Sequence, residues 1–176
     1  MNKPTRLTKS QLFPNKLPNL FLNRARDTID FIDKFQFPAC DCGEDNPLRK
    51  MINPVIESIN VDFDRDKFPG EWNTIFCFEV LEHLYNPLFF LEELKKSLLP
   101  DGIIYLSTPY QWPHIIKGRH HFHEITTDRL MWLFDEAGLK IIKQGKVSIA
   151  GKWYNHFYGF RPILRYFQHS RIYKLK

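Results

Sequence analysis

The sequence lacks any apolar run of about 18 residues, the length that a helix needs to cross a membrane. Its first residues are polar and include prolines, so they also lack the apolar centre of a secretory signal. These two absences argue against a membrane-spanning or secreted protein and predict a cytoplasmic location.

Cysteine is scarce. The 176 residues include only Cys40, Cys42 and Cys77, and all three fall in or beside apolar stretches, where reduced buried thiols are the common case. Because no second cysteine pair accompanies Cys40 and Cys42, the pattern favours packing over a zinc or redox site. The sequence predicts no metal site.

Acidic residues are missing from both ends of the chain. Residues 1–18 carry four basic residues and residues 151–176 carry six, with no acid in either segment. The whole chain has a formal charge of +5, so residues 19–150 have a net charge of −5. An acidic body between basic ends argues against a nucleic-acid partner.

The length suits one ordinary domain. Prolines among polar residues predict an extended basic arm over residues 1–18, and residues 19–150 form the expected α/β domain. Residues 151–176 mix aromatic and basic side chains and are expected to pack on or beside that domain, with a helix over 162–173. Two interpretations stay open for this extension: it covers a sheet edge, or it makes peripheral membrane contact.

The order of elements predicts a parallel sheet. Apolar spacing predicts a strand over 74–78, a helix over 86–99 and a strand over 103–108, which together make one βαβ crossover. The flanking pattern predicts helices over 19–34, from Asn46-Pro47 to about residue 53, and over 127–137, and strands over 35–40, 139–142 and 146–149. The predicted fold class is α/β, a Rossmann-like and mostly parallel sheet flanked by helices, with ligands beyond the carboxyl ends of the strands.

One stretch resembles a family signature. Residues 72–87, WNTIFCFEVLEHLYNP, resemble the fourth-strand motif of class I S-adenosylmethionine-dependent methyltransferases. Residues 94–102, LKKSLLPDG, and the end of the next strand at 107–109 are similar to the segments that follow in that family, as are the pair at 123–124 and the segment 136–139. The resemblance covers roughly residues 35–145 and implies a shortened class I methyltransferase fold.

The resemblance also implies S-adenosyl-L-methionine as cofactor, lying across the strand ends. The residues expected to bind it are Asp41, Cys42, Gly43 and Glu44 after the first strand, Asp62 and Asp64 further on, and Phe78, Glu79 and Val80 at the end of the fourth-strand motif.

Five of these residues have an expected role. A Cβ at position 43 would occupy the cofactor's volume, so Gly43 permits close approach of the backbone. Asp41 accepts from the cofactor's ammonium, Glu79 lies where the sheet edge touches adenosine and methionine, and Asp62 or Asp64 resembles the acid that holds the adenine amino group. The alternative is that Asp62 and Asp64 are solvated residues after a strand.

The chain departs from the family pattern in two places. Asp45 and Pro47 stand where the family has glycines, and an acid in that loop argues against a dinucleotide cofactor. Asp62 follows Gly43 by only 19 positions, too few for the family's full set of helices and strands, so one unit is expected to be reduced or lost. The ribose-binding acid has no clear counterpart, although a displaced Glu57 is a candidate.

Methyl transfer needs alignment and, for many acceptors, a base. The candidate catalytic residues are His83, His121 and His123. Alternatives stay open, because His83 also suits packing beneath its loop, and His121 and His123 also suit a polar cap or part of a metal site.

The sequence thus predicts a methyltransferase, a transferase whose acceptor is a small molecule or, as a weaker family-level implication, a saccharide. One alternative is a noncatalytic binding or scaffold protein with the same fold. A nucleotide-sugar or nicotinamide enzyme is a further alternative, but the glycine motif G-x-G-x-x-G of such enzymes is absent.

Overall fold

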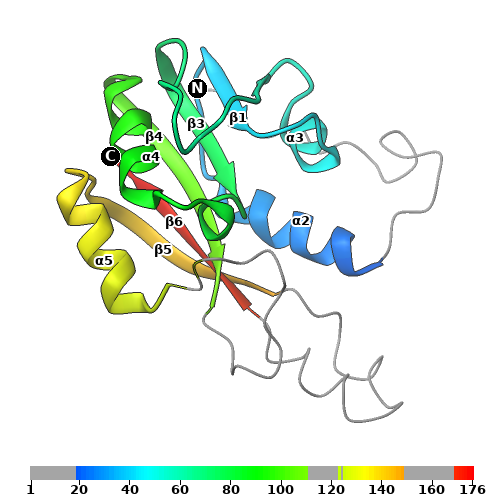
Figure 1. Cartoon of the computed structure of the whole chain (residues 1–176). Coiled ribbons are helices and arrows are strands. Elements are labelled where there is room, and N and C mark those ends of the chain that lie inside the picture. Colours follow the sequence, from blue (N-terminus) through cyan, green and yellow to red (C-terminus); the bar gives the residue numbers. More distant parts are fainter. Residues whose placement is uncertain (1–18, 111–122, 124, 149–168) are drawn as a thin grey trace.

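A six-stranded sheet organises the residues that the computed structural model describes, namely 19–110, 123, 125–148 and 169–176. The strands are β1 (Ala39–Cys42), β2 (Glu57–Ile59), β3 (Trp72–Phe78), β4 (Leu98–Pro109), β5 (Ile141–Ser148) and β6 (His169–Leu175), in the spatial order β2-β1-β3-β4-β6-β5 (Figure 1). The first four strands run parallel, whereas β6 is antiparallel to both β4 and β5. The predicted α/β class with a mostly parallel sheet is confirmed.

Helices cover both faces of this sheet. They are α2 (Asn19–Phe31), α3 (Pro47–Ile52), α4 (Pro87–Lys96) and α5 (Thr127–Glu136), with a short 3₁₀ turn η1 (Leu81–His83). Both α3 and α4 begin with Asn-Pro, and each asparagine side chain accepts a backbone N–H of the first turn. None of the described helices has the length and apolar character required to cross a bilayer.

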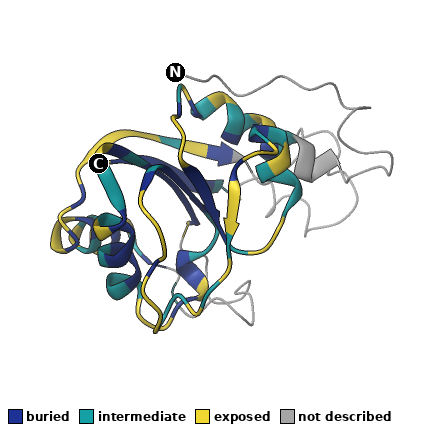
Figure 2. Ribbon diagram, turned by 90° about the horizontal axis from the view of Figure 1, so that it is seen from above, coloured by how far each residue is buried: buried dark blue, intermediate teal, exposed yellow. Residues whose placement is uncertain are grey.

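The side chains of β3 and β4 alternate between two apolar clusters, as the two-residue period of a strand requires. Ile75, Cys77, Ile104 and Leu106 pack with α4 and α5, whereas Phe76 and Tyr105 pack with residues around α2 and α3. Figure 2 shows the buried strands between the covering layers. The three cysteines are buried and free, as the packing interpretation predicts.

The first half of the sheet is shortened. Between Gly43 and Asp62 the chain forms α3 and the three-residue strand β2, and residues 60–71, all of them described, contain turns but neither helix nor strand. The missing unit is therefore a second helix and a third strand, and β2 is an edge strand.

The C-terminal segment completes the sheet. β6 lies between β4 and β5, so the expected boundary at residue 150 separates two neighbouring strands of one sheet. The helix expected over 162–173 is wrong for residues 169–173, because these residues pair with β4 and β5. The two late strands expected over 139–142 and 146–149 are likewise one continuous strand, β5.

An ion pair between the buried Lys174 and the exposed Asp33 ties this C-terminal strand to the segment after α2. The Lys174 ammonium lies 2.8 Å from Asp33 Oδ1, and the Tyr105 hydroxyl donates to the same carboxylate at 2.5 Å. Burial alone would raise the pKa of Asp33, but the hydrogen bonds from Lys174 and Tyr105 lower it to about 2. Lys176 makes a matching pair with Asp101 at 2.6 Å, with both side chains exposed.

These two pairs give a matched test. We expect Lys174→Met to lower the free energy of unfolding by about 1–2 kcal/mol, because it removes the charge-assisted hydrogen bonds that a buried ammonium donates to Asp33. Lys176→Met should change it by less than about 0.5 kcal/mol, as for most exposed pairs. Urea unfolding at neutral pH measures both variants, and equal losses would contradict the greater importance assigned to the Lys174–Asp33 pair.

Candidate active site

The register of the parallel strands brings three loops to one edge of the sheet. Asp41 of β1 pairs with Phe76 of β3, which pairs with Tyr105 of β4. Because the carboxyl ends of parallel strands share an edge, the residues after β1, β3 and β4 meet there. This edge is the candidate active site.

Asp41 is the single acidic residue of β1 and is only 3% exposed. Burial raises its pKa to about 7, although Asn46 Nδ2 donates to its carboxylate at 2.6 Å and Arg49 also acts to lower the pKa. Asn46 also caps α3 through its side-chain oxygen. The loop after β1 is thus held by side-chain hydrogen bonds in the place where the family pattern has further glycines.

Gly43 presents an open side. Its φ of +116° favours glycine, and a Cβ built there would meet nothing within 4 Å. Its N–H donates to Ile59 O at 2.7 Å, and Ser58 Oγ donates to its carbonyl at 2.6 Å, so its backbone is held by β2. The space on this side of Gly43 is therefore open, and a role of Gly43 in cofactor binding stays a prediction. Cys42 is buried beside it, and Glu44 is exposed.

Glu79 follows β3 in the left-handed region, with a φ of +56°. Its carboxylate accepts from Ser107 Oγ at 2.8 Å, and its N–H donates to Ser107 O at 2.9 Å. Arg24 of α2 forms an ion pair with the other carboxylate oxygen at 2.9 Å. Neighbouring strand and helix therefore hold a strained backbone position in place. Phe78 and Val80, the two residues beside it, are half-buried.

A second carboxylate lies beneath this loop. Glu82 is 1% exposed, and burial together with the Glu79 charge raises its pKa to about 8. Thr108 Oγ1 lies 3.5 Å from Glu82 Oε2. The site thus combines two buried carboxyls of raised pKa, on β1 and on η1, which is frequent at functional sites.

Two of the candidate histidines lie next to Glu82. His83 Nε2 is 3.9 Å from Glu82 Oε1 with its side chain 45% exposed, and the His123 N–H donates to Glu82 O at 3.1 Å. His121 lies outside the described residues. In the described ranges no group of three or more His, Cys, Asp or Glu side chains is arranged to hold a metal ion.

Asp62 and Asp64 have partners in their own loop and at the start of α4. Asp62 Oδ1 accepts from the Asp64 N–H at 3.1 Å, and Asp64 Oδ1 accepts from the Asn86 N–H at 2.7 Å, just before α4. These bonds stabilise the turn and its contact with α4. A role in holding adenine stays a prediction for both residues.

Sequence reasoning missed Arg24 and Ser107 as parts of the site. Arg24 precedes Glu79 by 55 positions, and no local pattern links a residue on α2 to the end of β3. Ser107 was recognised as part of the family's strand end, but its bond to Glu79 depends on the pairing of β3 with β4. The contact between Ser107 and Glu79 could have been suggested only by predicting that the two strands are neighbours and end at the same edge of the sheet.

A family of methyltransferase domains matches residues 22–144, most of the chain and all three loops of the site. The chain belongs to this family. Membership confirms the predicted resemblance and, with it, the methyltransferase class of enzyme and S-adenosyl-L-methionine as the cofactor of that class. The match begins within α2 and therefore includes Arg24.

Curated relatives match over shorter stretches. A tRNA U34 carboxymethyltransferase of Campylobacter curvus is 42% identical over 43 residues, which are 24% of this chain and 14% of that protein. The ubiquinone biosynthesis O-methyltransferase of Haemophilus ducreyi is 29% identical over 86 residues, 40% of this chain and 36% of that protein. The chain thus spans about a third or less of the length of each of these relatives.

Solved structures agree on the fold. The magnesium protoporphyrin IX methyltransferase of Synechocystis PCC 6803 superposes with a TM-score of 0.59 at 12% identity, covering 94% of this chain and 91% of that one. At this level of identity the likeness concerns the architecture alone.

The raised pKa of Asp41 predicts a stability gain on its removal. The folded protein holds a proton there that the unfolded chain releases, so between about pH 4 and 7 stability falls as pH rises. We expect Asp41→Asn to be more stable than the natural protein at pH 8, by on the order of 2 kcal/mol, and equally stable near pH 4.

Asp45 on the same loop is the control, since it is exposed and its pKa is lowered by hydrogen bonds from Arg49 and Lys50. Asp45→Asn should therefore lose stability at pH 8 and not gain it. Urea unfolding at both pH values measures the two variants. If Asp41→Asn is destabilised at pH 8, the raised pKa assigned to Asp41 is wrong.

Proposed function

We propose that this chain binds S-adenosyl-L-methionine across the carboxyl ends of β1 and β3 and transfers its methyl group to a small-molecule hydroxyl. The observation that carries the proposal is the open side of Gly43 at the strand ends that also present Asp41 and Glu79. A Cβ at residue 43 would fill that space, so the site fits a ligand that approaches the backbone closely.

The charges at this edge suit the amino-acid end of the cofactor. Asp41 and Glu79 are carboxylates for its ammonium, and the Arg24 guanidinium is a partner for its carboxylate. In the structure Arg24 and Glu79 neutralise one another at 2.9 Å. Because Arg24 is 28% exposed and lies on a helix surface, its side chain can turn to a ligand without disturbing the sheet.

The remaining predicted contacts belong to the nucleoside end. Phe78 and Val80 flank Glu79 and offer apolar surface, and Asp62 and Asp64 lie in the loop that leads to β3. The structure of the Synechocystis methyltransferase, which has a similar fold, is of a complex with S-adenosylhomocysteine, and this supports the choice of cofactor. When bound, the cofactor supplies a methyl group on a positively charged sulfur.

The proposed acceptor atom is a hydroxyl oxygen, because the ubiquinone biosynthesis relatives are O-methyltransferases. A hydroxyl must lose its proton as the new bond forms, so a base is useful. His83 lies next to the Glu82 carboxyl, and the backbone N–H of His123 donates to the Glu82 carbonyl. We propose that one of these histidines, or His121, takes the proton. A saccharide hydroxyl fits the same chemistry.

A second candidate function is binding without catalysis. It is favoured by the altered loop after β1, where Pro47 has no N–H to donate and the Gly43 N–H is already bonded to Ile59 O. Loss of cofactor binding would turn the fold into a scaffold, since fold alone does not determine function. Peripheral membrane contact through residues 151–176, a cytoplasmic location and the lack of a nucleic-acid partner stay predictions.

Cofactor binding separates these two functions. We expect isothermal titration with S-adenosylhomocysteine to give a dissociation constant in the micromolar range for the natural protein and no measurable binding for Gly43→Val. Gly138 is the matched control, because it also has a positive φ, of +67°, with nothing within 4 Å of an added Cβ, and it follows α5. Gly138→Val should bind normally, and equal loss in both variants would mean that backbone strain alone explains the effect.

The proposed base has its own test. Radiolabelled S-adenosyl-L-methionine and a panel of hydroxyl compounds identify an acceptor, after which His83→Ala, His121→Ala and His123→Ala are compared at saturating substrate. We expect one variant to lose about 10²–10⁴-fold in kcat with unchanged affinity for S-adenosylhomocysteine. Full activity in all three variants would remove histidine from the mechanism.

A further inference from the structure

A buried arginine lies at the carboxyl end of β4, on the face of the sheet that α5 covers. Arg171 of β6 pairs with Thr108 of β4 on one side and with Lys146 of β5 on the other, so the three side chains share one face. Arg171 donates to Pro109 O at 3.1 Å and to the Thr127 hydroxyl at 3.2 Å. The C-terminal strand therefore contributes a cation to the edge that carries the candidate active site.

The charge of Arg171 is not balanced by any described carboxylate. The residue is 3% exposed, its described partners are carbonyl and hydroxyl oxygens, and its Nε–H has no hydrogen-bond partner. Burial lowers the pKa of Arg171, which is the direction expected of a cation taken from water without a counterion. Buried charges are normally paired, so this arginine calls for an explanation other than stability.

Lys146 adds a second cation at the same place. It lies directly across from Arg171 in the β5–β6 ladder, and no described carboxylate forms an ion pair with it. Like charges directly opposite one another weaken a sheet. Both cations also lie over the ring of Tyr110, at 4.9 Å for Arg171 and 5.9 Å for Lys146.

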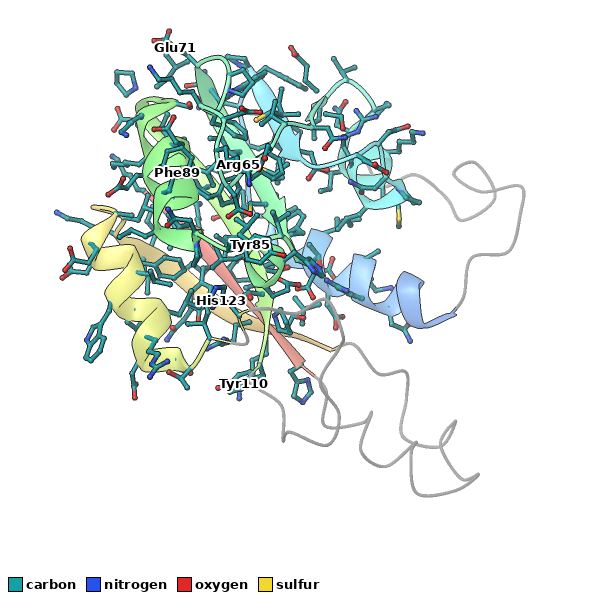
Figure 3. All side chains as sticks on the ribbon, viewed as in Figure 1. Arg65, Glu71, Tyr85, Phe89, Tyr110 and His123 are labelled. Carbon is teal, nitrogen blue, oxygen red and sulfur yellow. The ribbon has the colours of Figure 1, made fainter. Side chains whose placement is uncertain are left out.

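The surroundings favour negative charge. Thr127, which accepts from Arg171, is the first residue of α5, and the N-terminus of a helix carries a partial positive charge. Tyr110 is 39% exposed and follows β4 directly, so the cluster opens toward solvent at this residue (Figure 3). His123, a candidate base, lies two residues before Ile125, whose carbonyl accepts from Arg171 at 2.5 Å.

We propose that Arg171, Lys146 and Tyr110 form an anion subsite that binds a carboxylate or phosphate group of the methyl acceptor. The assignment of this anion to the acceptor rests on the proposed function, whereas the subsite itself rests on two neighbouring cations that no carboxylate of the described residues pairs. A bound anion would accept from the Arg171 Nε–H, separate the two like charges and hold the acceptor at the edge where the cofactor is expected.

The direct test observes the Arg171 Nε–H by NMR in the full chain, during titration with inorganic phosphate and with benzoate. Arg171→Lys assigns the signal by its disappearance. We expect a saturable shift of this signal with at least one anion, and affinity about tenfold weaker in Lys146→Gln, since one charge-assisted contact is lost.

Lys143→Gln is the matched control. It removes the same charge from the same strand, but the Lys143 ammonium donates to Phe31 O of α2 on the opposite face of the sheet. It should leave anion affinity unchanged. An unshifted Nε–H signal, or equal weakening in Lys143→Gln and Lys146→Gln, would overturn the subsite.

Two further measurements are needed. The first distinguishes a lipid headgroup from a soluble acceptor as the source of the anion, and the second separates the anion subsite from the proposed cofactor binding. Sedimentation with phosphatidylglycerol vesicles, lost in Lys146→Gln and kept in Lys143→Gln, assigns the anion to a lipid headgroup, and its absence assigns it to a soluble acceptor. Titration of Lys146→Gln with S-adenosylhomocysteine should give normal affinity. If the natural protein binds no cofactor while the Nε–H shift is present, the methyltransferase proposal fails and the anion subsite remains.

Discussion

Parallel pairing of β1, β3 and β4 is the constraint on which the rest of the structure depends. It sends the chain out of the sheet three times at one edge, after Cys42, Phe78 and Pro109, so residues far apart in sequence meet there. Everything chemically distinctive lies at that edge: the open side of Gly43, the left-handed Glu79 and the cation pair of β5 and β6. The apolar clusters on both faces hold the strands in this register, and the helices supply Arg24 from one side and the start of α5 from the other.

Burying ionisable groups at this edge of the sheet lowers the stability of the fold, and such a loss is consistent with a binding function. Asp41 and Glu82 are buried carboxyls with raised pKa, and Arg171 is a buried cation with a lowered pKa. A fold selected only for stability would place apolar side chains at these positions, because burying unpaired charge is unfavourable. Retained strain and unpaired charge are typical of sites whose partners arrive with a ligand.

Local signals in the sequence predicted the middle of the fold well. The strand–helix–strand unit around α4 was found from apolar spacing and from Asn86-Pro87, and α3 from Asn46-Pro47, because these signals act within one or two turns of chain. The position of β6 was not predicted, since a C-terminal strand between β4 and β5 depends on pairing across more than 60 residues in the case of β4. The same limit explains why local motifs indicated Gly43 and Glu79 as candidate site residues, whereas Arg24 was missed. Asp62 and Asp64 show the opposite limit. As acids they resemble the family's adenine-binding residue, but in the structure their carboxylates accept hydrogen bonds that stabilise the turn and its contact with α4.

The central claim is that one sheet edge binds S-adenosyl-L-methionine through Asp41, Gly43, Glu79 and Arg24. A crystal structure of the full chain with S-adenosylhomocysteine tests it most directly. The account predicts the amino-acid end of the ligand against Gly43, with Arg24 turned from Glu79 toward the ligand's carboxylate. A ligand bound elsewhere, or an intact pair between Arg24 and Glu79 with the space beside Gly43 empty at saturating ligand, would contradict it.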